Sequence, residues 1–228
     1  PADVRMPDGA VYDGDTEDNL FHGQGSLTWP DGRHYEGEFQ EGLMTGEGRL
    51  EGRDGCVQEG HFVNGVLNGE GSYTCPDASY QGQFTNGELT KGSVAYLDDN
   101  SYQGEFRDFQ PHGQGLWVTA SAEQFEGTFA EGYMVKGTYR NEEGYHYQGE
   151  FDFFTFEGKG ELTRPDGVVI RATFENGHAE GPGTRTRPRD EGEPVVEKGF
   201  FVRGDYYPSE KAWPIYRKDF NFFMEVHI

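Results

Sequence analysis

A glycine- and aromatic-rich unit recurs along most of the chain and constrains its fold more than any other feature. The clearest copy spans residues 35–48 and reads aromatic, spacer, glycine, spacer, aromatic, then a glycine turn and two glycines one residue apart. Copies begin at residues 12, 35, 58, 80, 102, 125, 147 and 170, so successive starts differ by 22 or 23 residues. A period this regular indicates an array of small units that each pack on their neighbours.

The alternation of residues within the unit predicts two β-strands. The aromatic-x-Gly-x-aromatic segment has a period of two, so its rings and glycine share one face, whereas Glu36 and Glu38 occupy the solvent-facing positions. A second segment, residues 23–29, alternates in the same way, and the Pro-Asp-Gly turn at 30–32 then leads into the next copy. We therefore predict an all-β fold, an elongated single-layer antiparallel sheet of about eight β-hairpins.

The repeated glycines need a physical reason, because glycine weakens the interior of a strand. We expect them to leave slots in which aromatic rings lie flat across the backbone, forming rows stabilised by contacts of about 0.5–1.5 kcal/mol each. The copies that begin at 80 and 125 are one residue short, with Lys91 and Lys136 before the surviving glycine, and should have tighter loops. Phe109 and the pair Phe153-Phe154 replace polar turn residues. These rings either contact a partner, dock the tail or cover their own hairpin.

The unit resembles the MORN repeat, whose pattern runs roughly YxGxFxxGxxxGxGxxxxxDG, and the likeness covers about residues 8–183. It implies a MORN-repeat array over residues 1–183, followed by a linker and C-terminal tail over 184–228. Residues 184–194 read as a polar linker, 195–208 as a short β segment, and Trp213-Pro214 as the start of a short helix. The tail is also similar to the C-terminal end of small MORN proteins of motile cilia and sperm flagella.

The formal net charge of −22 limits the partners that the chain can bind. Residues 184–228 are neutral, so the repeats carry the whole excess of acidic side chains. Nucleic acids and anionic phospholipids are held mainly by Lys and Arg, so we expect no nucleic-acid binding and disfavour phospholipid binding. A basic protein surface would be attracted.

The sequence offers no constellation that an enzyme, a metal or a cofactor requires. No nucleophile, base and charge stabiliser can be assembled, residues 46–48 lack the Lys-Ser/Thr of a phosphate loop, and residues 13–19 do not fit a calcium loop. We expect no enzyme activity and no cofactor. Cys56 and Cys75 are interpreted as two reduced thiols of a cytoplasmic protein. No apolar run is long enough to span a membrane.

These observations favour a non-enzymatic scaffold that binds other proteins. From the MORN resemblance and the tail, we expect it in the cytoplasm and in the ciliary or flagellar axoneme, at a radial spoke or beside a doublet. The alternatives are a membrane- or phosphoinositide-associated organiser and a regulatory module of an enzyme on another chain; homo-association is also open. The aromatic tail either caps the open sheet edge, which we favour, or packs into a partner.

The residues expected to form the partner-binding groove are the rings of the repeats: Tyr12, Trp29, Tyr35, Phe39, Phe62, Tyr80, Phe84, Tyr102, Phe106, Trp117, Phe125, Phe129, Tyr147 and Phe151. The residues expected to dock the tail are Trp213, Tyr216, Phe220, Phe222 and Phe223.

Overall fold

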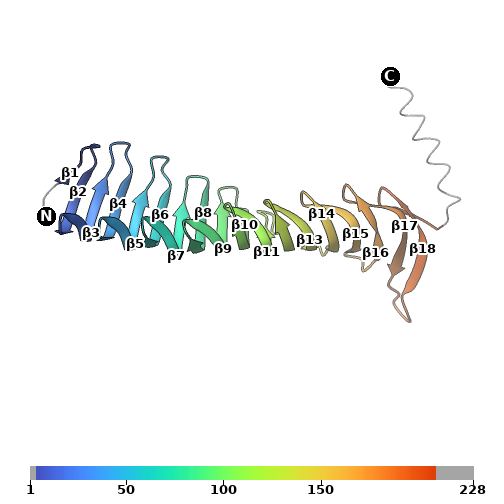
Figure 1. Cartoon of the computed structure of the whole chain (residues 1–228). Coiled ribbons are helices and arrows are strands. Elements are labelled where there is room, and N and C mark those ends of the chain that lie inside the picture. The colour runs from blue at the N-terminus through green and yellow to red at the C-terminus, as the bar shows by residue number, and fades with distance from the viewer. Residues whose placement is uncertain (1–3, 209–228) are drawn as a thin grey trace, which may run out of the picture. The chain divides into compact units, whose positions relative to one another are not determined.

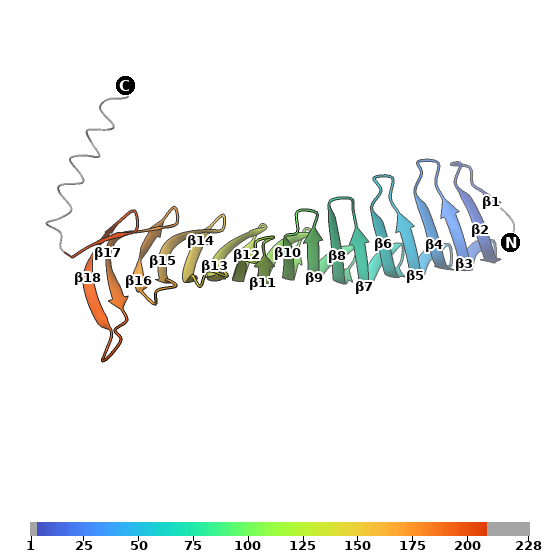
Figure 2. The same ribbon diagram turned by 180° about the vertical axis from the view of Figure 1, so that it is seen from behind.

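The computed structural model describes residues 4–208, and every helix or strand in this range is a β-strand, as predicted (Figures 1 and 2). The described part therefore holds no helix that could cross a membrane. The chain divides into two units, residues 1–120 and 121–228.

The strands of the first unit are β1 (Val4–Arg5), β2 (Val11–Glu17), β3 (Leu20–Thr28), β4 (His34–Gln40), β5 (Leu43–Glu51), β6 (Val57–Val63), β7 (Val66–Thr74), β8 (Ala78–Thr85), β9 (Glu88–Tyr96), β10 (Ser101–Arg107) and β11 (Gln110–Val118). Those of the second are β12 (Gln124–Ala130), β13 (Tyr133–Arg140), β14 (His146–Asp152), β15 (Thr155–Thr163), β16 (Val169–Glu175), β17 (His178–Arg187), β18 (Val195–Val202) and β19 (Asp205–Tyr207).

Each unit is an open antiparallel sheet in which strands follow one another in chain order. In the first unit every strand from β1 to β11 pairs with the next one. The second unit repeats this arrangement from β12 to β19. The predicted pairing of hairpin beside hairpin is confirmed within both units.

The hairpins close with two-residue turns whose residues both have positive φ, such as Glu41 at 51° and Gly42 at 82°. Such turns match the right-handed twist of the strands that they join. The turns are also tied to the preceding hairpin, because Gly42 donates its N–H to the Phe21 carbonyl at 3.0 Å and Gly87 donates to that of Leu67 at 2.8 Å. The turn edge of the first unit is therefore held by backbone hydrogen bonds between repeats.

A bulge interrupts each full-length hairpin. In the pairing of β4 with β5, Gly37 faces Gly48 but Glu38 faces Thr45, which leaves two residues of β5 without a counterpart. Bulges of this kind bend a strand and increase its twist. In the pairing of β8 with β9 the shift leaves out one residue rather than two, and the pairing of β12 with β13 does the same. The shortening predicted for these two copies is confirmed.

The slots predicted at the glycines are present in the repeats that begin with tyrosine at residues 12, 35, 102 and 147. A Cβ atom on Gly37 would lie 2.5 Å from the Tyr35 hydroxyl oxygen and 2.6 Å from the Gly48 Cα. The shortened hairpins need their glycines for a different reason. A Cβ atom on Gly82 would lie 2.6 Å from the Gly92 Cα, so there the facing backbones themselves approach too closely for a side chain.

Rings of neighbouring repeats contact one another within each unit. Tyr35 contacts Phe39 of its own repeat and Phe62 of the next one edge-to-face, with ring centroids 5.2 and 5.3 Å apart. In the second unit Tyr147 is placed in the same way against Phe151 at 5.1 Å and Phe174 at 5.0 Å. Each ring therefore stabilises two hairpins at once, as expected for the core of a repeat array.

Phe109 and Phe154 cover the shortened hairpin that precedes them rather than their own. The ring centroid of Phe109 lies 5.4 Å from that of Tyr80. The ring centroid of Phe154 lies 5.1 Å from that of Phe125 and 6.2 Å from that of Phe129. Both residues have positive φ, 58° and 63°, which is uncommon for a bulky side chain. The packing of each ring against the neighbouring repeat compensates for this backbone conformation.

Replacing Phe154 by alanine should therefore lower the free energy of unfolding by about 2 kcal/mol, since this half-buried ring loses its contacts with Phe125 and Phe129 of the preceding repeat. The adjacent Phe153 is 64% exposed and provides the matched control, because Phe153→Ala removes the same side chain from the same turn. We expect the control to change stability by less than about 1 kcal/mol. Urea unfolding followed by tyrosine fluorescence would measure both, and equal losses would contradict the covering role of Phe154.

Two predictions for the C-terminal part are corrected or confirmed, and the others lie outside the described residues. Strand β17 continues to Arg187, so residues 184–187 are strand and only 188–194 form the connection to β18. The register explains this, because Thr184 to Arg187 pair with β18 on one side. The predicted short β segment is confirmed as β18 and β19. The predicted helix and the tail-docking residues Trp213, Tyr216, Phe220, Phe222 and Phe223 lie outside the described residues.

The prediction of two reduced thiols is wrong for this structure, in which Cys56 and Cys75 form a disulfide. The cause is the stacking of the turns between hairpins. Cys56 leaves the turn between β5 and β6, Cys75 enters the turn between β7 and β8, and their Cα atoms lie 4.2 Å apart. Their sequence separation of 19 is slightly less than one repeat, and this spacing is the signal that the two residues meet.

Candidate functional site

The rings assigned to a partner-binding groove lie in the core instead. Eleven of the fourteen are buried, among them Tyr35, which is 0% exposed, and Phe39, which is 2% exposed. The other three, Trp29, Tyr80 and Trp117, are half-buried. The Arg33 guanidinium lies over the Trp29 ring, with its Cζ atom 4.8 Å from the ring centroid. The prediction that this set lines an exposed groove is corrected, because the rings of successive repeats interlock over the glycine slots and cover one another.

The tyrosine hydroxyls are occupied by the bulges and are not free for chemistry. Tyr35 donates a hydrogen bond that the carbonyls of Glu38 and Thr45 share, at 3.2 and 3.3 Å. Burial, with the nearby Glu38 carboxylate adding to it, raises the pKa of Tyr35 to about 12. Tyr102 repeats this arrangement, and burial with the Glu105 carboxylate raises its pKa to about 12. These phenols therefore keep their protons and hold the bulge in place.

The opposite face of the first unit is exposed, and the strand register arranges its side chains in a straight line. Asp13 faces Ser26, Ser26 faces Glu36, Glu36 faces Arg49 and Arg49 faces Glu59. The three carboxylates of this line, Asp13, Glu36 and Glu59, are called the acidic row; each is exposed and each comes from a successive repeat. The following two repeats place Gln81 and Gln103 at the same position, so the row ends after three charges.

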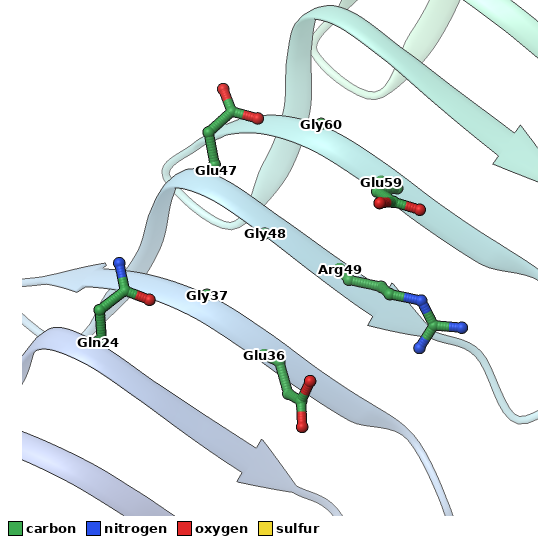
Figure 3. Close-up of a pocket in the computed structure, with 8 residues that line it drawn as sticks. All are labelled: Gln24, Glu36, Gly37, Glu47, Gly48, Arg49, Glu59 and Gly60. Carbon is green, nitrogen blue, oxygen red and sulfur yellow. The ribbon is translucent and has the colours of Figure 1, made fainter.

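A shallow depression surrounds part of the acidic row. Its lining consists of backbone from glycines and of polar side chains: Gln24, Glu36, Gly37, Glu47, Gly48, Arg49, Glu59 and Gly60 (Figure 3). A neighbouring depression is lined by Glu59, Glu70, Gly71, Ser72 and Gln81, so the two share Glu59. The two depressions, whose lining residues lie on strands β3 to β8, are here called the outer trough.

The outer trough contains one arginine, Arg49, which lies between Glu36 and Glu59 in the strand register. Arg49 forms an ion pair with Glu51, and Figure 3 shows its side chain extending along its strand, away from Glu47. The hydrogen bond from Arg49 lowers the pKa of Glu51. Imidazoles lie near two other carboxylates, with His34 at 3.3 Å from Glu36 and His61 at 3.4 Å from Glu47. They neutralise these carboxylates only when they are protonated.

The second unit has a different charge pattern at the equivalent positions. There the solvent-facing residue after the first residue of each copy is Glu126, then Gln148, then Arg171. The residue before the last glycine of the repeat is Lys136, then Lys159. The acidic row is therefore a feature of the first unit. Within residues 4–208, no three His, Cys, Asp or Glu side chains are grouped as a metal site requires.

The model of the MORN repeat matches residues 12–32, 35–57, 59–79, 102–121, 147–169 and 172–189, which is more than half of the chain. The chain belongs to the MORN-repeat family. The two copies that the family model omits, those starting at 80 and 125, are the shortened hairpins, and they extend the MORN array because they form the same fold. No curated protein sequence matches the chain.

Two solved structures are similar to this MORN-repeat chain. One is a mutant of the TCP10 domain of Danio rerio CPAP, with 11% identity over 91% of this chain and 100% of that one, and a TM-score of 0.43. The other is the TCP domain of Drosophila melanogaster SAS-4 in complex with a proline-rich motif of Ana2, with 12% identity, coverage of 86% and 88%, and a TM-score of 0.26. At these TM-scores neither structure supports an inference about this chain.

The charged surface differs from the site expected from the sequence. The alternation rule already placed Glu36 and Glu38 on the solvent-facing side, but the rings were assigned to the binding face because rings are the common anchors of protein interfaces. The missed signal is the identity of the spacer in each aromatic-x-Gly segment. It is acidic in the first three copies and neutral in the next two.

Proposed function

We propose that this MORN-repeat chain is a non-enzymatic scaffold that binds a positively charged segment of another protein on the outer trough of its first unit. The observation that carries the proposal is the acidic row, in which register places three exposed carboxylates in line on an unpartnered sheet face. Complementary charge speeds association and selects partners. The MORN family and the net charge of −22 support a protein partner over an anionic membrane.

The axoneme of cilia or flagella is the proposed location of this scaffold. The support is the resemblance of the tail, about residues 184–228, to the C-terminal end of small MORN proteins of motile cilia and sperm flagella. Affinity capture from isolated axonemes, with the full chain as bait, should recover an axonemal protein that carries a basic segment. Recovery of an enzyme subunit in equal amounts would instead favour a regulatory module.

The binding surface is tested by neutralising the acidic row with Asp13→Asn, Glu36→Gln and Glu59→Gln together. We expect this variant to bind a fluorescent octa-arginine peptide at least about tenfold more weakly than the wild type, because three charge pairs are lost. Fluorescence anisotropy at low and physiological salt would measure the dissociation constant.

The control variant carries Glu17→Gln, Glu41→Gln and Glu88→Gln, three exposed carboxylates at the turn edge of the same unit. It changes the net charge by the same amount, so it separates local contact from the general field of the protein. We expect its affinity to stay within about twofold of the wild type, since screened charges away from the contact contribute little. Equal weakening by both variants would contradict a binding site at the acidic row.

A further inference from the structure

The Cys56–Cys75 disulfide joins the ends of β6 and β7 that lie away from the two-residue turn between these strands. Val57 faces Thr74 at the last pair of the β6–β7 ladder, and the two cysteines are the next residues outward. The ladder itself consists of six residue pairs and includes neither cysteine. Opening the disulfide therefore breaks no pairing between the two strands.

The turns that hold the two cysteines have hydrogen bonds of their own. In the first turn the Gly52 N–H donates to the Cys56 carbonyl at 2.7 Å, and the Cys56 N–H donates to the Asp54 carboxylate at 3.1 Å. In the second turn the Cys75 N–H donates to the Ala78 carbonyl at 2.8 Å. None of these bonds involves sulfur, so we expect the reduced protein to keep its fold and the disulfide to open and close reversibly.

The two cysteines differ in how far solvent reaches them. Cys56 is 8% exposed, whereas Cys75 is half-buried and lines an open depression together with Glu59 and Thr74. Exchange of a disulfide requires a thiolate to approach one of its sulfur atoms, so access decides which sulfur is attacked. Exposed disulfides are the labile ones, whereas disulfides that serve only a structural role resist reduction. The depression provides the approach to Cys75.

We infer that Cys75 is a site of thiol–disulfide exchange with small thiols of the glutathione class, which makes the disulfide a redox-sensitive brace between two neighbouring turns. The small thiolate attacks the Cys75 Sγ atom, the bond between the two cysteines breaks, and Cys56 leaves as a thiolate that takes up a proton. A second small thiolate then attacks the sulfur of the first one, which releases Cys75 and forms the disulfide of the small thiol. Two small thiols are thereby oxidised and the protein disulfide is reduced, and the reverse sequence closes it.

The surroundings of Cys56 suit a leaving group. Arg33, Arg53 and Asp54 line a depression together with Cys56, so two guanidinium groups and one carboxylate lie on this side. Nearby positive charge stabilises a thiolate, and a more stable thiolate leaves faster. The more exposed sulfur is therefore the one attacked, and the sheltered sulfur is the one released.

The test treats the native full chain with reduced glutathione, traps intermediates with acid and analyses them by intact-mass spectrometry and peptide mapping. We expect the disulfide to open without denaturant and the trapped glutathione to be on Cys75 at least fivefold more often than on Cys56. Circular dichroism of the reduced protein should match that of the oxidised protein. A disulfide that opens only when urea unfolds the chain, or glutathione found equally on both cysteines, would overturn the inference.

Two single variants compare the thiols when neither can form the disulfide. Cys56→Ser leaves only the Cys75 thiol, and Cys75→Ser leaves only the Cys56 thiol. In the folded variants we expect the Cys75 thiol to react with oxidised glutathione at least fivefold faster than the Cys56 thiol, and in urea the two rates should become similar. Equal rates in the folded variants would contradict selective access to Cys75. These experiments use no basic peptide, so their failure is distinguishable from failure of the proposed function.

Discussion

Replacing Gly37 by valine should lower the free energy of unfolding of the first unit by at least about 3 kcal/mol, because the slot beneath Tyr35 is already full. A Cβ atom there would lie 2.5 Å from the Tyr35 hydroxyl oxygen, 2.6 Å from the Gly48 Cα and 2.7 Å from the Glu47 carbonyl oxygen. The ring could rotate away, but the two backbone atoms belong to the paired strand. Relief therefore requires β4 and β5 to separate, which also breaks the bulge.

The neighbouring substitution Glu36→Val is the matched control. It introduces the same β-branched side chain one residue earlier in β4, where the side chain is exposed on the opposite face. We expect it to change stability by less than about 0.5 kcal/mol. Urea unfolding monitored by circular dichroism would compare both variants with the wild type. A Gly37→Val protein as stable as the control would show that the slot is not filled as described.

Much of this fold follows from the sequence because the repeat imposes the same local rules many times. The period fixes the number of hairpins, and the alternation in aromatic-x-Gly-x-aromatic fixes which side chains face the rings. The register then follows, since a slip by one residue would move Tyr35 and Phe39 to the solvent side. The one-residue deletion before Lys91 was also visible in the sequence, and it appears as a shorter bulge.

Other features could not be derived from a single repeat because they depend on contacts between repeats. Phe109 reaches back over Tyr80 of the preceding hairpin, a contact that no alternation rule contains. The Cys56–Cys75 disulfide likewise depends on two turns lying side by side. The burial of the ring face has the same origin: Tyr35 is covered by Phe62 of the next repeat, so the rings that resemble a binding surface in one copy become core in the array. The spacer residues on the other side stay exposed, and the proposed binding surface lies there.

Alkaline unfolding should reveal the buried tyrosines. The pKa of Tyr35 and of Tyr102 is raised from 10 to about 12 by burial and by the adjacent Glu38 and Glu105 carboxylates, respectively. Between these values the unfolded chain has released the phenolic protons, whereas the folded chain keeps them. Their contribution to stability is therefore complete below about pH 10 and is lost as the pH rises towards 12, at a rate of at most about 1.4 kcal/mol per pH unit for each tyrosine.

The double variant Tyr35→Phe/Tyr102→Phe isolates this effect from the general repulsion of a highly acidic protein at high pH. At neutral pH it should be less stable by about 1–3 kcal/mol, because the backbone carbonyls at the two bulges lose their hydroxyl donors. Its stability should then fall less steeply than that of the wild type between pH 10 and 12.

Tyr133→Phe, at a tyrosine that is 45% exposed, is the control and should keep the wild-type slope. Urea midpoints at half-unit pH steps, with tyrosinate absorbance recorded in parallel, would measure both slopes. A double variant that loses stability as steeply as the wild type would show that these hydroxyls are not held protonated by the fold.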